Sequence, residues 1–477
     1  MQVWAEISVV QPRVRNAMDV HLLRGCCVEA GRSDVVSRQL EGLRCALGDA
    51  SDAYLTTVIE ELKAGSRVLR ELADLSQIYQ DRVPLILEPL NIALPCLSRS
   101  LRDVTAYHGD RTRSKVNRWR TMYHKMTNEA GGLPLPGRFM AYNRYLSAVR
   151  DLLTRSPNFN LNMLEKLRRQ IMQLREARSI PLPSIQAGPL VRYDSLPRYD
   201  VDVTPHWAEH IFSLPLPSRT ALKRRHRGSK SVGLHHPWGH LDIPRHSKSL
   251  LRRCFNDDGI SLTVYQSGGD NSPYMLLRIL DDETPWFSVR GVHELCIQRE
   301  DNSLQFKRWS RSEGQSKVWA VLCFMTWEEL VLMHSTFVSL KARNGLTISL
   351  HPEEYDIRGE EKLFQACIDD DGFKHSLIVY QDRSTRGLRL HTAVWDGELR
   401  GCPVWTAFVT HQSASPTWLE RISRHRVCLA DVQLHVFCRQ YRQQNQRRGP
   451  AGAFEIRFCS EEAARRFEDV FDSSQPA

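Results

Sequence analysis

The sequence predicts a multidomain α + β protein in which an antiparallel helical bundle precedes two copies of a seven-stranded β-sheet module, each closed by a C-terminal helix. Apolar residues recur at helical spacing between about 33 and 180 and at every second position from 249 onward. The stretch CFNDDGISLTVYQ at 254–266 returns as CIDDDGFKHSLIVYQ at 367–381. Together these patterns indicate a helical first half and a duplicated sheet module in the second half.

The first region is helical. We expect residues 1–32 to be poorly ordered or to form a short helix and residues 33–180 to form a bundle, because apolar side chains such as Leu55, Ile59 and Leu62 lie on one helical face. Five prolines between the apolar runs are expected to break or start helices. They are Pro84, Pro89, Pro95, Pro134 and Pro136.

The second region, residues 181–248, is rich in proline, serine and histidine and loses all apolar periodicity. Such a composition favours a basic linker that is disordered in large part. From 249 the pattern changes to strands separated by turn residues. We expect one module at 249–345, ending in a helix capped by Thr326 and Glu329, and a second module at 346–473.

The two modules can be aligned at three pairs of identical residues. Gly259 and Gly372, Tyr265 and Tyr380, and Trp286 and Trp405 are separated by 113, 115 and 119 positions. The growing separation places insertions in the second copy, chiefly around 411–426 and 440–453.

Bulk properties exclude several classes of protein. No apolar run is long enough for a transmembrane helix, and Glu6 interrupts the apolar start, so no secretory signal is expected. The twelve cysteines lack CxxC spacing, which favours a reducing compartment, cytoplasmic or nuclear. The net charge is +10, and residues 101–180 contain sixteen Lys and Arg against six Asp and Glu. A basic electrostatic partner surface would therefore lie in the helical region.

The order of seven strands and a helix resembles the pleckstrin-homology (PH) superfold over residues 249–343 and 360–473. The resemblance implies that Trp327 or Phe467 plugs the open end of each barrel. It also implies a module that binds phosphoinositides, peptides or proteins and does not usually catalyse. The stretches PCLSRSLRDVT at 95–105 and EAGGLPLPGRF at 129–139 are similar to a group of filamentous-fungal proteins with a helical first half. That second likeness implies no activity.

The acidic turns could hold a metal ion or join two strands. Residues 256–259 and 369–372 each end in Asp-Gly, which suits a tight hairpin. A calcium loop needs alternating oxygen ligands over a dozen residues, whereas strand sequence resumes at Ile260 and Phe373. We therefore predict hairpin turns.

Two patterns in the linker each allow a functional and a structural interpretation. His206, Glu209 and His210 match the HxxEH zinc pattern, but prolines leave under three turns of helix, so a short docking helix or solvated linker is favoured. A basic run in the linker is either a nuclear-import signal or solvated charge. The candidate import residues are Lys223, Arg224, Arg225 and Arg227.

A basic helix around 111–125 could face nucleic acid or an anionic membrane. The favoured reading points its aromatic and methionine residues inward, because they fall at helical spacing. These residues are Trp119, Met122, Tyr123 and Met126.

In the second module, four basic residues flank or enter the second and third strands, where PH domains that bind phosphoinositides place theirs. They are Lys374, Arg383, Arg386 and Arg389. No P-loop, GxGxxG, GxSxG or protein-kinase signature is present.

We therefore expect a non-enzymatic scaffold or adaptor with no catalytic, metal or cofactor site and no small-molecule substrate. Its partners are expected to be proteins, bound by strand addition or beside the closing helix. A phosphoinositide membrane is the first alternative, and nucleic acid is the second, less favoured one.

Overall fold

The computed structural model describes residues 17–48, 53–181, 205–223, 228–310, 315–441, 448–449 and 452–472. These residues divide into two compact units. The helical region forms the first unit together with residues 236–245 and 280–287. Most of both sheet modules forms the second unit. None of the helices in the described ranges has the length and apolar character needed to cross a membrane.

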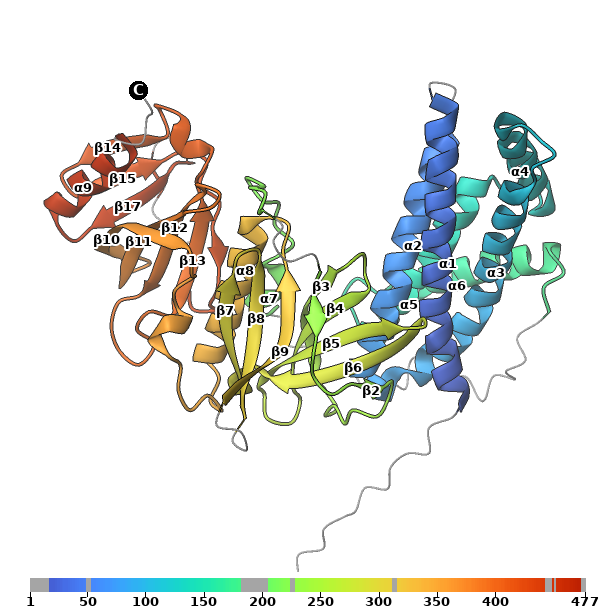
Figure 1. Ribbon diagram of the computed structural model, residues 1–477, viewed down its shortest axis with the longest axis horizontal. Coiled ribbons are helices and arrows are strands. Elements are labelled where there is room, and N and C mark those ends of the chain that lie inside the picture. Colours follow the sequence, from blue (N-terminus) through green and yellow to red (C-terminus); the bar gives the residue numbers. More distant parts are fainter. Residues whose placement is uncertain are drawn as a thin grey trace, which may run out of the picture. The chain divides into compact units, whose positions relative to one another are not determined.

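Within the described residues, the helical region of the first unit contains six α-helices (Figure 1). They are α1 (Ala17–Leu47), α2 (Ala53–Ile78), α3 (Pro84–Gly109), α4 (Lys115–Glu129), α5 (Leu135–Thr154) and α6 (Leu161–Ala177). α1 packs along α2 and α3, while α5 packs against α2, α3 and α6. The first helix thus begins at Ala17, well before the expected start near residue 33. Residues 1–16 lie outside the described residues.

The prolines have two different roles in these helices. Pro84 and Pro136 lie in the first turns of α3 and α5, where a missing N–H is tolerated, and Pro134 caps α5. Pro89 and Pro95 lie inside α3, so the expectation that they end a helix is wrong. At Pro95 the helix cannot donate to the Asn91 carbonyl, and the buried Arg175 of α6 donates to it instead at 2.9 Å.

The first sheet module has the predicted order of seven strands and a helix. The elements are β3 (Lys248–Phe255), β4 (Ile260–Gln266), β5 (Pro273–Asp281), β6 (Thr284–Gly291), β7 (Leu295–Glu300), β8 (Ser303–Ser310), β9 (Gln315–Cys323) and α8 (Trp327–Ala342). Thr326 accepts a hydrogen bond from the Glu329 amide, which is half of the expected capping box, and the Glu329 side chain pairs with Arg253 of β3 instead. Two short strands, β1 (Lys230–Ser231) and β2 (His236–Pro237), extend its two sheets, whose orders are β2-β6-β5-β4-β3 and β1-β9-β8-β7.

The second module forms one open sheet in the order β14-β15-β17-β10-β11-β12-β13-β16. Its elements are β10 (Glu360–Asp370), β11 (Phe373–Asp382), β12 (Leu388–Val394), β13 (Pro403–Phe408), β14 (Leu419–Ser423), β15 (Arg426–Leu429), β16 (His435–Val436), β17 (Phe454–Phe458) and α9 (Glu461–Asp472). Phe467 of α9 packs on Phe364 and Phe458 in its core. The two modules are open sheets in the described residues, not closed barrels.

Part of the segment expected to be a linker is packed. Within the second unit, Ala208, Ile211 and Leu222 lie in the core of the first module, and β1 (Lys230–Ser231) pairs with β9. Within the first unit, the indole N–H of Trp238, one residue after β2 (His236–Pro237), donates to Ser76 of α2 at 3.0 Å. These residues fill cores without helical or strand periodicity, which is why the sequence pattern does not reveal them.

Candidate functional site

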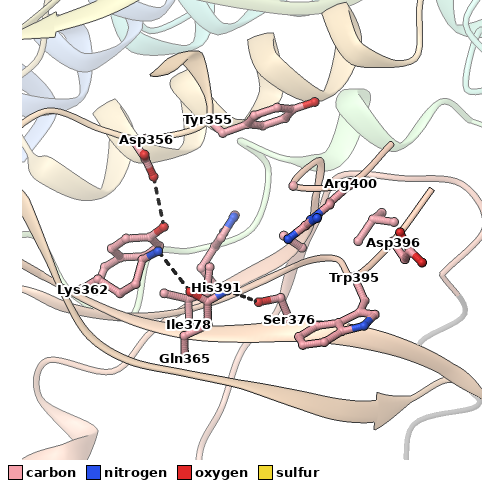
Figure 2. A pocket seen from close by; sticks show the side chains of 14 residues that line it. Tyr355, Asp356, Lys362, Gln365, Ser376, Ile378, His391, Trp395, Asp396 and Arg400 are labelled. Carbon is pink, nitrogen blue, oxygen red and sulfur yellow. Dashed lines mark hydrogen bonds between the residues drawn. The ribbon is translucent and has the colours of Figure 1, made fainter. Parts of the chain in front are cut away.

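A cavity of about 460 Å³ opens on one face of the second module (Figure 2). We call it the connector cleft. One wall comes from the segment 343–359, here called the connector, which joins α8 to β10 and contributes Tyr355 and Asp356. The floor comes from β10, β11 and β12, and Trp395 and Arg400 from the loop after β12 complete it. The cleft therefore depends on the segment that links the two modules.

Strand periodicity explains the floor of the cleft. Ser376, Ile378 and Tyr380 alternate along β11 and so point to one face of the sheet. In the antiparallel register, Ile378 lies opposite His391 and Ser376 lies opposite Ala393. The repeated Tyr-Gln strand end of the sequence thus places Tyr380 in the cleft.

Hydrogen bonds order the polar side chains of the cleft. Gln365 receives a hydrogen bond from Lys362 Nζ at 3.1 Å and donates one to Ser376 Oγ at 2.9 Å (Figure 2). The Tyr380 hydroxyl donates to Asp356 Oδ1 at 3.4 Å. Burial raises the pKa of Tyr380, so this hydroxyl keeps its proton and remains a donor.

His391 is a neutral group at the base of the cleft. Burial and the Arg389 charge lower the pKa of His391 well below its ordinary value. Its side chain is 5% exposed, and Nδ1 has no hydrogen-bond partner among the described residues. A buried ring nitrogen without a hydrogen bond lowers the free energy of unfolding, and a ligand that donates to it would remove this cost.

The charges that line the cleft are balanced. Lys362 and Arg400 are exposed cations, and neither has a carboxylate partner among the described residues. Asp356 and Asp396 provide two carboxylates. With Tyr355 and the 41%-exposed Trp395 as aromatic walls, the cleft offers donors, acceptors and stacking surfaces, which suit recognition.

Three of the four basic residues predicted for lipid binding are exposed. Lys374 lies near the start of β11, whereas Arg383 and Arg386 lie just beyond its end. Nine residues of strand separate Lys374 from Arg383, which corresponds to about 30 Å. The three do not converge on one point.

Arg389, the fourth lipid candidate, is buried. It is 1% exposed and forms an ion pair with Glu360 at 2.6 Å, and its guanidinium also stacks over the Tyr380 ring. A buried, paired guanidinium is not accessible to a membrane surface. Arg389 therefore holds the β10–β12 face together.

The acidic turns are hairpins in both modules. Asp371 and Gly372 have φ values of 53° and 78° and connect the paired residues Asp370 and Phe373, as in a type I′ turn. In the first module the Asn256 side chain bonds to both backbone groups of Ser229 at 2.8 Å. No group of three or more potential metal ligands occurs within the described ranges.

The HxxEH pattern does not form a zinc-binding helical face. α7 (Trp207–His210) is a single turn whose N-cap is His206, and Glu209 closes a capping box by accepting from the His206 amide at 2.7 Å. Glu209 also pairs with Lys248 at 2.7 Å. These contacts make the pattern a short packed helix.

The structure describes the basic helix α4 in full but only the first residue of the basic run at 223–227. Lys223 is exposed, while Arg224, Arg225 and Arg227 lie outside the described residues. In α4 the predicted inward face is confirmed for three residues, and Tyr123 is half-buried. The buried residues are Trp119, Met122 and Met126.

Several of the residues that line the connector cleft carry no recognisable sequence pattern. Tyr355 and Asp356 lie in a segment without strand or helix periodicity, and Trp395 and Arg400 lie in a turn. The sequence signal that could have indicated the cleft is Trp395, a large aromatic residue directly before the turn pair Asp396-Gly397.

Comparison with known families supports the duplicated module. Residues 237–360 and 361–476 match two family models, and each is described as a PH domain found in tandem in fungal proteins. The first match begins inside the expected linker, in agreement with its packed residues. Comparisons with curated proteins and with solved structures found no match.

Proposed function

Since residues 237–476 belong to the PH domains found in tandem in fungal proteins, we propose that the chain is a non-enzymatic adaptor that binds a segment of a partner protein in the connector cleft. PH domains are typically non-catalytic interaction modules, and no enzyme family is indicated. The observation that carries the proposal is the cleft itself, with its aromatic walls and two exposed cations that have no carboxylate partner in the described part of the chain.

The balance of charges favours a peptide over a phosphoinositide headgroup. A headgroup with several phosphates would meet the carboxylates of Asp356 and Asp396 as well as the cations of Lys362 and Arg400. A peptide carries donors, acceptors and side chains of both signs, which this lining accommodates. The ordered Gln365–Ser376 hydrogen bond also limits the rearrangement that binding would need.

The test compares two charge reversals in the full-length chain. Arg400→Glu changes the cleft, whereas Arg424→Glu changes an exposed residue between β14 and β15, at the far edge of the sheet. Proximity labelling in cells should show partners that are lost with Arg400→Glu and kept with Arg424→Glu. Loss of a charge-assisted hydrogen bond of about 1.5–3 kcal/mol predicts at least about a tenfold weaker affinity of a recovered partner for the purified variant.

Membrane binding through Lys374, Arg383 and Arg386 is the alternative, because these side chains are exposed. Sedimentation with phosphoinositide vesicles separates the two proposals. Vesicle binding that is lost when these three residues are reversed, with partners unchanged in Arg400→Glu, would replace the peptide proposal by the lipid one.

A further inference from the structure

Two cysteines face each other at the edge of the second module. β10 pairs with β17 through Ile368 opposite Phe458 and Asp369 opposite Arg457, which makes Cys367 and Cys459 the next opposed pair. The Cys459 amide donates to the Cys367 carbonyl at 3.1 Å, and the two Sγ atoms are also 3.1 Å apart. Both thiols are free in this structure.

This arrangement is compatible with the geometry of a disulfide. Opposed residues of a hydrogen-bonded antiparallel pair have Cα atoms about 5.5 Å apart, within the range of about 4.4–6.8 Å that disulfides span. The Sγ atoms need only small side-chain rotations to bond. We propose that Cys367 and Cys459 are a redox modification site that forms an intramolecular disulfide when the protein meets a peroxide.

The reaction proceeds in two balanced steps. The exposed Cys459 sulfur attacks hydrogen peroxide, the O–O bond breaks, and a sulfenic acid and one water form. The Cys367 sulfur then attacks the sulfenic sulfur and releases a second water as the S–S bond forms. Two thiols are oxidised, and one peroxide is reduced to two waters.

The accessibility of the two thiols sets this order of attack. Cys459 is exposed, whereas Cys367 is partly covered. Burial and the neighbouring Cys459 raise the pKa of Cys367 to about 11, which keeps it protonated at neutral pH. Its attack is therefore expected to accelerate as the pH rises.

The disulfide would fix the start of α9 to β10. Cys459 precedes the Ser460 hydroxyl that accepts from the Ala463 amide in the first turn of α9. The two cysteines are 92 residues apart, so the bond closes a large loop. Cys367 also lies opposite Ser376, which lines the connector cleft, although the proposal does not depend on any ligand there.

The test treats the full-length protein with hydrogen peroxide, denatures it, alkylates the thiols and maps the peptides by mass spectrometry. The number of alkylated thiols should fall by two from the twelve in the chain, with a Cys367–Cys459 crosslink that dithiothreitol removes. Hydrogen exchange in the first turn of α9 should become slower in the oxidised protein.

Cys459→Ser should abolish the crosslink, whereas Cys45→Ser, which removes an exposed cysteine of α1, should leave it intact. The proposal is overturned if the wild-type protein keeps all twelve thiols or acquires only sulfinic acid at Cys459. It is equally overturned if Cys459 crosslinks to a different cysteine.

Discussion

The Arg175 guanidinium replaces a hydrogen bond that the α3 backbone cannot make. Its Nη1 donates to the carbonyls of Asn91 and Ile92 at 2.9 and 3.1 Å, and its Nε donates to the Pro181 carbonyl at 2.8 Å. Pro95 has no backbone N–H to donate to the carbonyl of Asn91, four residues earlier in α3. The Arg175 side chain of α6 supplies this donor, and α3 remains continuous through Pro95. The sequence alone could not pair Pro95 with an arginine 80 positions away.

We expect Arg175→Met to destabilise the helical region by about 1–3 kcal/mol, because it leaves buried carbonyls unsatisfied. Hydrogen exchange measured by mass spectrometry should become faster in α3 and α6. Arg169→Met, an exposed residue of the same helix, is the control and should change little. The Pro95→Ala background restores a backbone donor for Asn91, so the cost of Arg175→Met should be smaller there. An equal cost in both backgrounds would contradict this account.

Among the helices, α8 has buried polar side chains that the helical pattern of the sequence does not predict. Its start follows from the Thr326 cap, but nearly all of its side chains are buried, including the polar His334 and Lys341. Lys341 is paired with Glu354 of the connector at 2.8 Å. The polar face is buried because the connector and the second module cover it, and these contacts depend on residues that sequence periodicity does not relate.

Trp327, at the start of α8, contacts the second module. The resemblance implies a plug of its own barrel, and the residue does lie in the core of the first module. Its ring also packs edge-on against Phe408 with centroids 5.4 Å apart, and its indole N–H donates to Glu360 at 3.1 Å. One tryptophan therefore stabilises both modules.

Gly387 leaves the space that this tryptophan occupies. A Cβ at Gly387 would lie 2.6 Å from a ring carbon of Trp327, so Gly387→Ala must displace the indole. We expect a loss of about 1–3 kcal/mol, typical of overpacking, and a lower melting temperature of the tandem modules by calorimetry. Gly345→Ala is the matched control, because no described atom lies within 4 Å of the position its Cβ would take. A melting temperature that is the same in both variants would show that the Trp327 contact is not tight.

At the scale of the molecule, the two modules are in direct contact within the second compact unit. Arg299 of the first module pairs with Asp382 of the second at 2.5 Å, and both side chains are almost fully buried. Repeats, turns and strand order could be predicted because they depend on local spacing. Three features could not be predicted, because each joins residues that only the folded chain brings together. They are the Arg299–Asp382 pair, the packed residues around Ala208 and the connector cleft.

The buried histidines of the tandem modules predict how the free energy of unfolding of these modules depends on pH. His334 is 2% exposed, and burial, Arg389 and Arg299 lower its pKa to about 3. His391 is lowered by the same kind of burial, with Arg389 and His334 nearby. An unfolded histidine binds a proton below about pH 6.5, whereas the folded His334 does not until about pH 3. The unfolded state therefore binds more protons between these values, and stability must fall as the pH falls from 6.5.

We expect each such histidine to lower the free energy of unfolding by about 2 kcal/mol between pH 7.5 and pH 5. Urea unfolding of the full chain, followed by tryptophan fluorescence, measures this loss. His334→Gln should show a smaller pH dependence than the wild type, and the exposed His425→Gln should retain the wild-type dependence. Burial would raise the pKa of Asp382, but Arg299 holds it below its ordinary 3.8, so its own loss of stability begins only at lower pH. If His334→Gln and the wild type lose the same free energy between the two pH values, His334 is not neutral and buried between the modules.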